Sequence, residues 1–309
     1  MFETIRNAWK VAEIRKKLLF TLLIIIIFRF GSALTVPFLE LSKVQSWMDQ
    51  NATGGNFLEY LNVLTGGALS KATIFSLSIT PYINASIIMQ LLTYAIPPLE
   101  RLQSEGEEGR KRINQITAIV SLGLSIFMSI AYYFTLKNMG AVEYTEGFQG
   151  VFAAVVISAC FVAGAMLVVW MGNRINDKGI GNGISLIIFA GIVSRLPDGM
   201  HVIFQYLQAG TVNILNVILF AVIALAMIVF VVAISQGIRK IPVQYAKRVV
   251  GRKMYGGHST FLPLKVNQAG VIPIIFASSV LMFPVTIAQF IDNEFVHKAA
   301  DLFTWGTPL

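Results

Sequence analysis

Residues 78–92 read SITPYINASIIMQLL, a stretch in which polar residues precede the apolar run of a predicted membrane helix. Pro81 has no amide hydrogen, so it opens a helix rather than continuing one. Irregular backbone at membrane depth is tolerated only where it is buried in protein or lines a water-filled cavity. The stretch therefore predicts a multi-helix membrane protein, and the polar residues concerned are Ser78, Thr80, Pro81, Asn84 and Ser86.

The composition supports this class. Of the 309 residues, 55% are hydrophobic and 13% are charged, and the mean hydropathy is +0.69. A spanning helix needs about 20 mostly apolar residues. Seven segments are candidates, of which the fifth is too short to cross unaided: residues 18–36, 74–96, 116–136, 151–171, 183–196, 212–235 and 268–290.

The basic residues predict the topology. A cytoplasmic N-terminus places 18 of the 24 Lys and Arg residues in cytoplasmic segments and five outside. Cytoplasmic loops carry an excess of Lys and Arg, so this orientation is favoured. The remaining cation, Arg29, lies inside the first span, where we expect it to face protein or water in a structural role. The first apolar run has no small-residue cleavage site, so we interpret it as a retained span.

Residues for catalysis or metal binding are sparse. The single cysteine, Cys160, excludes a disulfide framework and disfavours a thiolate metal site. His201, His258 and His297 fall in separate predicted loops. The sequence also lacks the common metalloprotease, phosphate-loop and serine-hydrolase patterns. We therefore predict no enzyme activity, no metal and no cofactor.

Helix breaks recur at three of the predicted spans. Before the second span, residues 56–64 predict a short amphipathic helix ended by Gly66 and Gly67. This helix is too short to span and is either interfacial or re-entrant. The other breaking residues are Gly179, Gly181 and Gly183 before the fifth span and Pro273 and Pro284 in the seventh.

Two isoleucine pairs follow these breaks. Ile83 and Ile87 share one face of the second span, and Ile184 and Ile188 share one face of the fifth, because each pair is four residues apart. Such pairs could contact lipid or neighbouring helices, or they could line a passage. Spacing alone does not choose between these interpretations.

Several long blocks of sequence resemble the SecY family, the central subunits of bacterial protein-conducting channels. They occur in the family's order and on matching spans: PYINASIIMQLL with SEGEEGRKRINQ, DKGIGNGISLIIFAGIVSRLP, and IPVQYAKR followed by LPLKVNQAGVIPIIFASS. The resemblance implies an all-α polytopic membrane protein built from two inverted five-helix halves. That family has ten spans, so we expect this chain to be a fragment with an incomplete second half.

The resemblance also implies a domain organisation. Residues 1–196 would form the N-terminal half, 197–211 a hinge loop, and 212–309 the start of the C-terminal half. Residues 57–69 would form a plug that closes the channel from outside, which favours the re-entrant interpretation of this segment. The plug residues singled out are Phe57, Leu61, Leu64, Gly66 and Gly67.

In the resembling family an aliphatic ring constricts the pore. By pattern matching, the ring residues here are Ile83, Ile87, Ile184, Ile188 and Ile275. An apolar constriction offers no fixed charge and gates by dewetting. A lateral gate would let signal sequences and nascent membrane helices reach lipid, and its residues here would be Ser86, Gln90, Ser278 and Ser279.

The predicted cytoplasmic loop 236–267 is basic and contains no acidic residue. Cytoplasmic loops of membrane proteins are generally rich in Lys and Arg. A docking surface for an anionic partner would have the same composition. The resemblance favours docking of the ribosome, through rRNA at its tunnel exit, and of the SecA ATPase. The residues concerned are Arg239, Lys240, Lys247, Arg248, Arg252 and Lys253.

The expected function is that of a channel subunit in the bacterial cytoplasmic membrane. The resemblance implies a heterotrimer with SecE and SecG that moves unfolded preproteins across the membrane and releases membrane helices sideways. The alternative is a secondary transporter, which also uses broken helices and inverted repeats. A transporter predicts polar or charged side chains at the central site, whereas the breaks here converge on isoleucine.

Overall fold

The computed structural model describes residues 9–51, 62, 65–243, 248–250, 253–255 and 260–267. The chain forms two compact units that meet in sequence between Asp198 and Gly199, and each unit is described on its own. The predicted seventh span and the plug residues Phe57, Leu61 and Leu64 lie outside the described residues.

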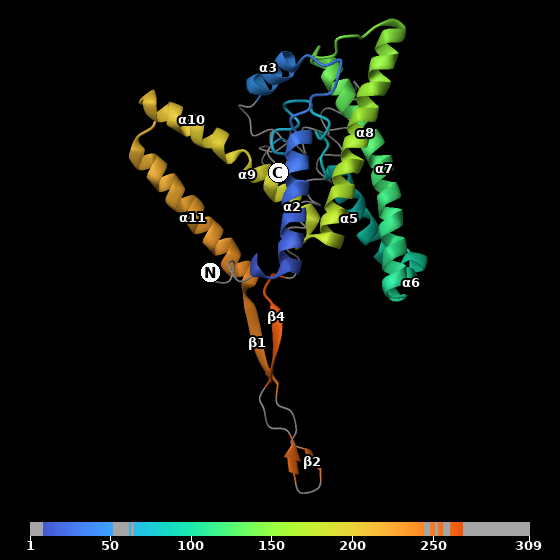
Figure 1. The fold of residues 1–309 in the computed structure, drawn as a ribbon, viewed down its shortest axis with the longest axis vertical. Helices are drawn as coiled ribbons and strands as arrows, with labels where there is room; N and C mark the ends of the chain where they lie inside the picture. Colours follow the sequence, from blue (N-terminus) through green and yellow to red (C-terminus); the bar gives the residue numbers. More distant parts are fainter. Residues whose placement is uncertain are drawn as a thin grey trace, which may run out of the picture. The chain divides into compact units, whose positions relative to one another are not determined.

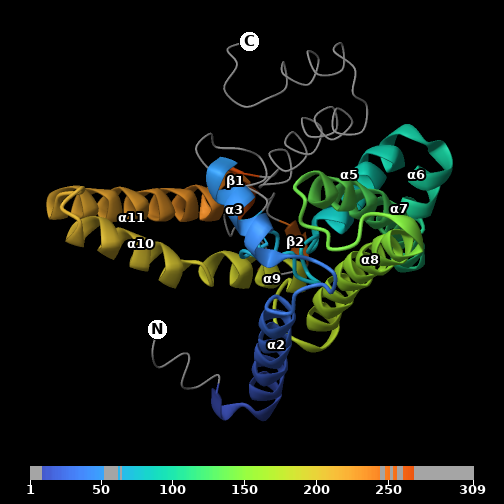
Figure 2. The same cartoon turned by 90° about the horizontal axis from the view of Figure 1, so that it is seen from above.

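The first unit is a helical bundle (Figures 1 and 2). The long helix α7 packs against both α5 and α8, and α8 in turn contacts α2 and α9. Helices α7 and α8 therefore form the centre of the contacts in this unit. The helix bounds are α2 Ala12–Gly31, α3 Leu41–Asn51, α5 Thr80–Ala95, α6 Pro97–Ser104, α7 Glu107–Asn138, α8 Gly147–Lys178 and α9 Gly183–Val193.

Glycines let these segments approach closely. A β-carbon at Gly164 of α8 would overlap the carbonyl oxygen of Ile74, and one at Gly31 of α2 would overlap the ring of Phe75. The Phe75 ring instead stacks on Phe28, with 5.7 Å between ring centroids. Membrane helices associate through such close packing because lipid is as apolar as their side chains.

Most predicted spans are confirmed as helices. Among the described residues, four helical stretches are long and apolar enough to cross a membrane: α7, α8, Gly183–Gln208, and α11, which runs from Ile214 to Gln236. Helix α11 is apolar on all sides, and none of its residues is buried. That pattern is typical of a helix that faces lipid or another protein on every side.

The predicted start of the second span at residue 74 is wrong. Residues 65–79 form an irregular turn structure, and α5 begins at Thr80 with Pro81 in its first turn. Ala72 and Ser78 have φ angles of 42° and 47°, which a right-handed helix does not allow. Hydropathy reflects the apolar side chains of this stretch but contains no information on its backbone conformation.

The predicted hinge loop 197–211 is mostly helical. Helix α10 spans Leu196–Gln208, so the irregular connection to α11 shrinks to residues 209–213. Helix α9 has 11 residues, or about 16 Å of length, against roughly 30 Å of hydrocarbon. Only the longer stretch Gly183–Gln208 is long and apolar enough to be a candidate span, and Arg195, which the topology count placed outside, falls within that stretch.

The basic segment 236–267 contains a β-ribbon rather than an open loop. Strand β1 (Ile238–Val243) pairs antiparallel with β4 (Thr260–Lys265), from Ile238 opposite Lys265 to Val243 opposite Thr260. Strands β2 (Arg248–Val250) and β3 (Lys253–Tyr255) form a second antiparallel pair. The ribbon continues from the end of α11 (Figure 1), so the all-α expectation holds for the described spans but not for this segment.

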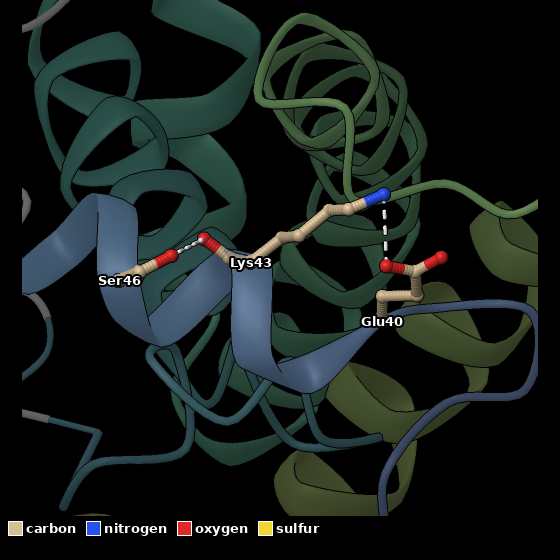
Figure 3. Close-up of polar contacts among 3 residues, drawn as sticks. All are labelled: Glu40, Lys43 and Ser46. Carbon is tan, nitrogen blue, oxygen red and sulfur yellow. Dashed lines mark hydrogen bonds and ion pairs between the residues drawn. The ribbon is translucent and has the colours of Figure 1, made fainter.

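Helix α3 is held by its approach segment. Leu39 forms a β-bridge with Val142, and the Glu40 amide donates to the carbonyl of Ala141 at 2.8 Å. Figure 3 shows the first turn, where Lys43 Nζ lies 2.8 Å from a Glu40 carboxylate oxygen. Exposed pairs of this kind contribute only about 0–1 kcal/mol. The backbone contacts and the buried Val44 therefore position the helix.

We predict that Gly164→Ala lowers the free energy of unfolding by about 1–3 kcal/mol, because the added methyl meets backbone rather than a mobile side chain. Gly123→Ala is the matched control, since a β-carbon there would meet nothing within 4 Å. That variant should be neutral or gain up to about 1 kcal/mol of helix propensity. Thermal unfolding in detergent measures both, and equal effects would contradict the packing argument.

Candidate pore and plug site

The start of α9 is fixed by three asparagine and threonine side chains. Asn182 caps the helix, because its Oδ1 accepts from the amides of Ile184 at 3.1 Å and Ser185 at 3.3 Å. Asn176 Oδ1 accepts from the Gly183 amide at 2.7 Å. Thr21 Oγ1 of α2 accepts from the Ile180 amide, in the loop just before α9, at 3.2 Å. These bonds fix the direction in which α9 presents its isoleucines.

Three predicted ring residues pack against one apolar cluster. Ile83 of α5 and Ile184 and Ile188 of α9 all lie on it, half-buried. Ile87 is buried, with 7% of its surface exposed, but is grouped with neither apolar cluster of the described residues. Ile275 lies outside the described residues. The cluster consists of Ile24, Phe28, Phe75, Ile79, Val168, Met171, Ile175 and Ile187.

Of the two described residues of the predicted plug, Gly66 lies against α9, the helix that carries Ile184 and Ile188, and Gly67 lies against the side chain of Arg195. Gly66 and Gly67 have φ angles of 67° and 84°, a left-handed conformation that glycine adopts without strain. A β-carbon at Gly66 would lie 2.7 Å from the carbonyl oxygen of Gly191. Gly191 follows Ile184 and Ile188 on one face of α9, at the i, i+4, i+7 spacing. We call residues 65–67 the plug-root turn.

A buried polar network holds the chain that follows this turn. The Gly67 amide donates to the Asn62 carbonyl at 2.8 Å, and Asn62 Oδ1 accepts from the Ser70 amide at 3.0 Å. Ser76 Oγ donates to the carbonyl of Ala68 at 3.0 Å. Tyr132 of α7 donates its hydroxyl to the Leu69 carbonyl at 2.8 Å. Backbone groups that lack helical partners at membrane depth are thus satisfied inside the protein.

Sequence reasoning missed this network and Arg195. The hydroxyls of Thr65, Thr73 and Ser76 were the available signal, since three polar residues in an apolar stretch need acceptors once buried. All three have 2% exposure or less. The role of Tyr132 carried no local signal, because its acceptor lies 63 residues away.

The described half of the predicted lateral gate borders a polar pocket. Ser86 and Gln90 of α5 line a cavity of about 410 Å³ together with residues of α6 and α7, among them Arg110 and Asn114. Ser278 and Ser279 lie outside the described residues. The structure therefore describes only the α5 residues of this set, and the lateral gate remains a prediction.

Four of the six predicted docking residues lie in the described strands of the β-ribbon. Arg239 and Lys240 are consecutive in β1, so their side chains leave opposite faces. Lys240 Nζ lies 4.7 Å from the centroid of the Phe261 ring, a cation–π contact. Arg248 and Lys253 stand in β2 and β3, and Lys247 and Arg252 lie outside the described residues. The basic character is therefore not confined to one side of the ribbon.

The fold defines a class of membrane protein. A solved structure described as "The structure of a protein conducting channel" matches 89% of this chain and 59% of its own length, with a TM-score of 0.62 and 19% identity. Sec61 in the canine ribosome-channel complex matches with a TM-score of 0.60 and 18% identity, over 89% of this chain and 60% of Sec61. This protein is thus a helical membrane protein with the fold of a protein-conducting channel.

The family follows from sequence. The SecY family model matches residues 73–308, and the chain belongs to the SecY family. The protein translocase subunit SecY of Escherichia coli strain K12 is 44% identical over 282 residues, covering 90% of this chain and 62% of that protein. The Thermotoga maritima subunit is 41% identical over 297 residues, covering 95% and 68%. The chain thus spans about three fifths of the E. coli protein.

We predict that Tyr132→Phe lowers the free energy of unfolding by about 1 kcal/mol, because one hydrogen bond to a buried carbonyl is lost. Amide exchange in residues 65–72 should accelerate with it. Tyr133→Phe is the matched control, since Tyr133 is also a tyrosine of α7, is buried, and its ring packs edge-on against the ring of Phe134. Thermal unfolding and hydrogen exchange report the two effects, and indistinguishable variants would remove the assigned role of Tyr132.

Proposed function

We propose that this chain supplies the N-terminal half and the beginning of the C-terminal half of a channel that moves unfolded preproteins across the cytoplasmic membrane and releases membrane helices sideways. The carrying observation is the plug-root turn, seated on the same face of α9 as Ile184 and Ile188. A segment that packs directly beside a constriction is placed to close it.

The chemistry of the ring suits an unfolded polypeptide. A passage for any side chain needs a narrow part without fixed charge or strong hydrogen bonding, and isoleucine meets both conditions. An apolar neck dewets and limits ion flow. The pivoting side chains of Ile83, Ile184 and Ile188, rather than backbone, would yield to the passing chain and close again behind it. Ile87 and Ile275 would complete the ring.

The lateral exit would work by partitioning. Ser86 and Gln90 on α5 would form one wall and Ser278 and Ser279 the other. A segment rich in Leu, Ile or Phe gains by entering lipid, whereas a charge at its centre costs about 2.5–3.5 kcal/mol on insertion scales. The channel then needs only to expose each segment both to water and to lipid. Crosslinks from a nascent signal sequence to probes at Gln90 would support this gate.

The partners proposed are SecE and SecG as small subunits and SecA or a ribosome as the driving component. The solved ribosome-channel complex that contains Sec61 supports a ribosome partner by its fold. We also propose a cytoplasmic N-terminus, because it places the β-ribbon and most Lys and Arg residues inside. A secondary transporter is disfavoured because the chain belongs to a family of translocase subunits.

The direct test is reconstitution of the chain, completed with the spans it lacks relative to its family, together with SecE in liposomes. SecA and ATP should drive a preprotein into a protease-protected state. In the same vesicles, Ile87→Asn and Ile188→Asn should raise ion leak severalfold and admit preproteins with weakened signal sequences, because a polar neck hydrates.

Ile88→Asn and Phe189→Asn are the matched controls, since these residues directly follow Ile87 and Ile188, point to another face of the same helices and are 39% and 62% exposed. They should keep the resting leak low. Absence of protected preprotein would refute the proposed function, and equal leak in ring and control variants would refute only the placement of the ring.

The docking proposal predicts a salt-dependent interaction. Reversing Arg252 and Lys253 to Glu together should weaken ribosome and SecA binding at least tenfold, because contacts to rRNA phosphate release counterions and steepen the salt dependence. Lys137→Glu, at the C-terminal end of α7, is the control on the proposed outer side. Binding titrations at several salt concentrations decide the matter, and unchanged affinity in the double variant would rule out these two residues.

A further inference from the structure

Arg29 buries part of its cationic group near the end of α2. The side chain as a whole is half-buried, but its Nη1 atom is fully buried and has no hydrogen-bond partner within the described part of the chain. A buried guanidinium nitrogen without an acceptor is costly, because it has left water and gained nothing in exchange. Intramembrane cations are rare and usually mark a functional position.

The plug-root turn covers this nitrogen. A β-carbon at Gly66 would lie 3.0 Å from Arg29 Nη1 and 2.7 Å from the Gly191 carbonyl oxygen. The seated turn therefore occupies the narrow space between Arg29 and the ring-bearing helix. Its glycines permit this closeness, since the site has no room for a side chain at Gly66.

Two features partly offset the free-energy cost of burying Arg29 Nη1. Asp198 lies near enough to attract the Arg29 charge electrostatically, and Gly191 is at the C-terminal end of α9, where the helix dipole favours cations. Asp198 is itself exposed, so its attraction is weakened by screening where water reaches it. Neither feature supplies an acceptor to Nη1, and its burial remains the larger effect.

We propose that Arg29 acts as a built-in bias towards release of the plug: seating the plug-root turn buries a cation that water would satisfy once the turn lifts. This inference rests on the proposed function for the meaning of release. Arg29 is then a positioning residue. It keeps the closed state, with the plug-root turn seated, only moderately more stable than the open state, in which the turn has lifted. A signal sequence then has to supply less free energy to open the channel.

Arg195 provides the contrast. Its Nη2 would lie 2.9 Å from a β-carbon at Gly67, so it packs against the same turn as Arg29. Among the described residues, however, only the Nη1 atom of Arg29 is a buried side-chain nitrogen or oxygen without a partner. Removing Arg195 therefore changes the packing and charge beside the turn without relieving an unsatisfied donor.

The test measures amide exchange in the completed channel, reconstituted with its small subunits. Exchange in peptides covering residues 62–70 reports lifting of the turn, because the Gly67 and Ser70 amides donate to Asn62. Arg29→Met should slow this exchange about 5- to 30-fold, since the seated turn no longer covers a cation. Arg195→Met should leave it unchanged or make it faster.

Faster or unchanged exchange in Arg29→Met, or equal slowing in both variants, would overturn the inference. The same vesicles report translocation, where Arg29→Met should reduce export of a preprotein with a weakened signal sequence more than export of an intact one. Loss of translocation in the unsubstituted protein would refute the proposed function. Slowed exchange would still support the bias of the turn in that case.

Discussion

The first unit depends on one constraint: a non-helical chain within a membrane must satisfy its own backbone. Residues 65–79 meet it mostly with turn bonds between backbone groups and with the pairing of Ile74 and Ala72 to Leu34 and Val36. The side chains of Asn62, Ser76 and Tyr132 add three more bonds to this backbone. Because this segment is irregular, α5 begins only at Thr80. The turn at Gly66 and Gly67 is left free to reach α9. The start of α5 and the approach of Gly66 to α9 thus depend on how this irregular segment is folded.

Much of the helical framework could be predicted because it depends on local composition. Long apolar runs identified α7, α8 and α11, and Pro81 correctly marked the first turn of α5. The glycines around residue 181 preceded a short helix, as expected. The isoleucine pairs were visible because a spacing of four residues fixes a helix face. That Ile83, Ile184 and Ile188 pack against one cluster while Ile87 is grouped with none could not be predicted, since spacing within a helix does not identify neighbours on other helices.

The remainder depended on contacts between distant parts of the chain. The start of α5 at Thr80 follows an irregular stretch in which Ala72 and Ser78 have positive φ angles, and hydropathy carries no information on backbone conformation. Helix α10 occupies most of the stretch that was expected to be a hinge loop. The β-ribbon was not predicted, because the prediction for residues 236–267 used only their Lys and Arg content. That content indicates the side of the membrane but not the backbone conformation. The unsatisfied nitrogen of Arg29 is a property of the assembled packing alone.

The bond between Thr21 and the Ile180 amide joins residues 159 positions apart. A ribosome adds about 5–20 residues per second, so the first helix waits roughly 8–30 seconds for this partner to be synthesised. During that interval the flank of α2 that later meets α8 and α9 must be occupied by lipid or by another protein. The N-terminal half can therefore acquire its final packing only late in biogenesis, after α9 has followed α8 out of the exit tunnel.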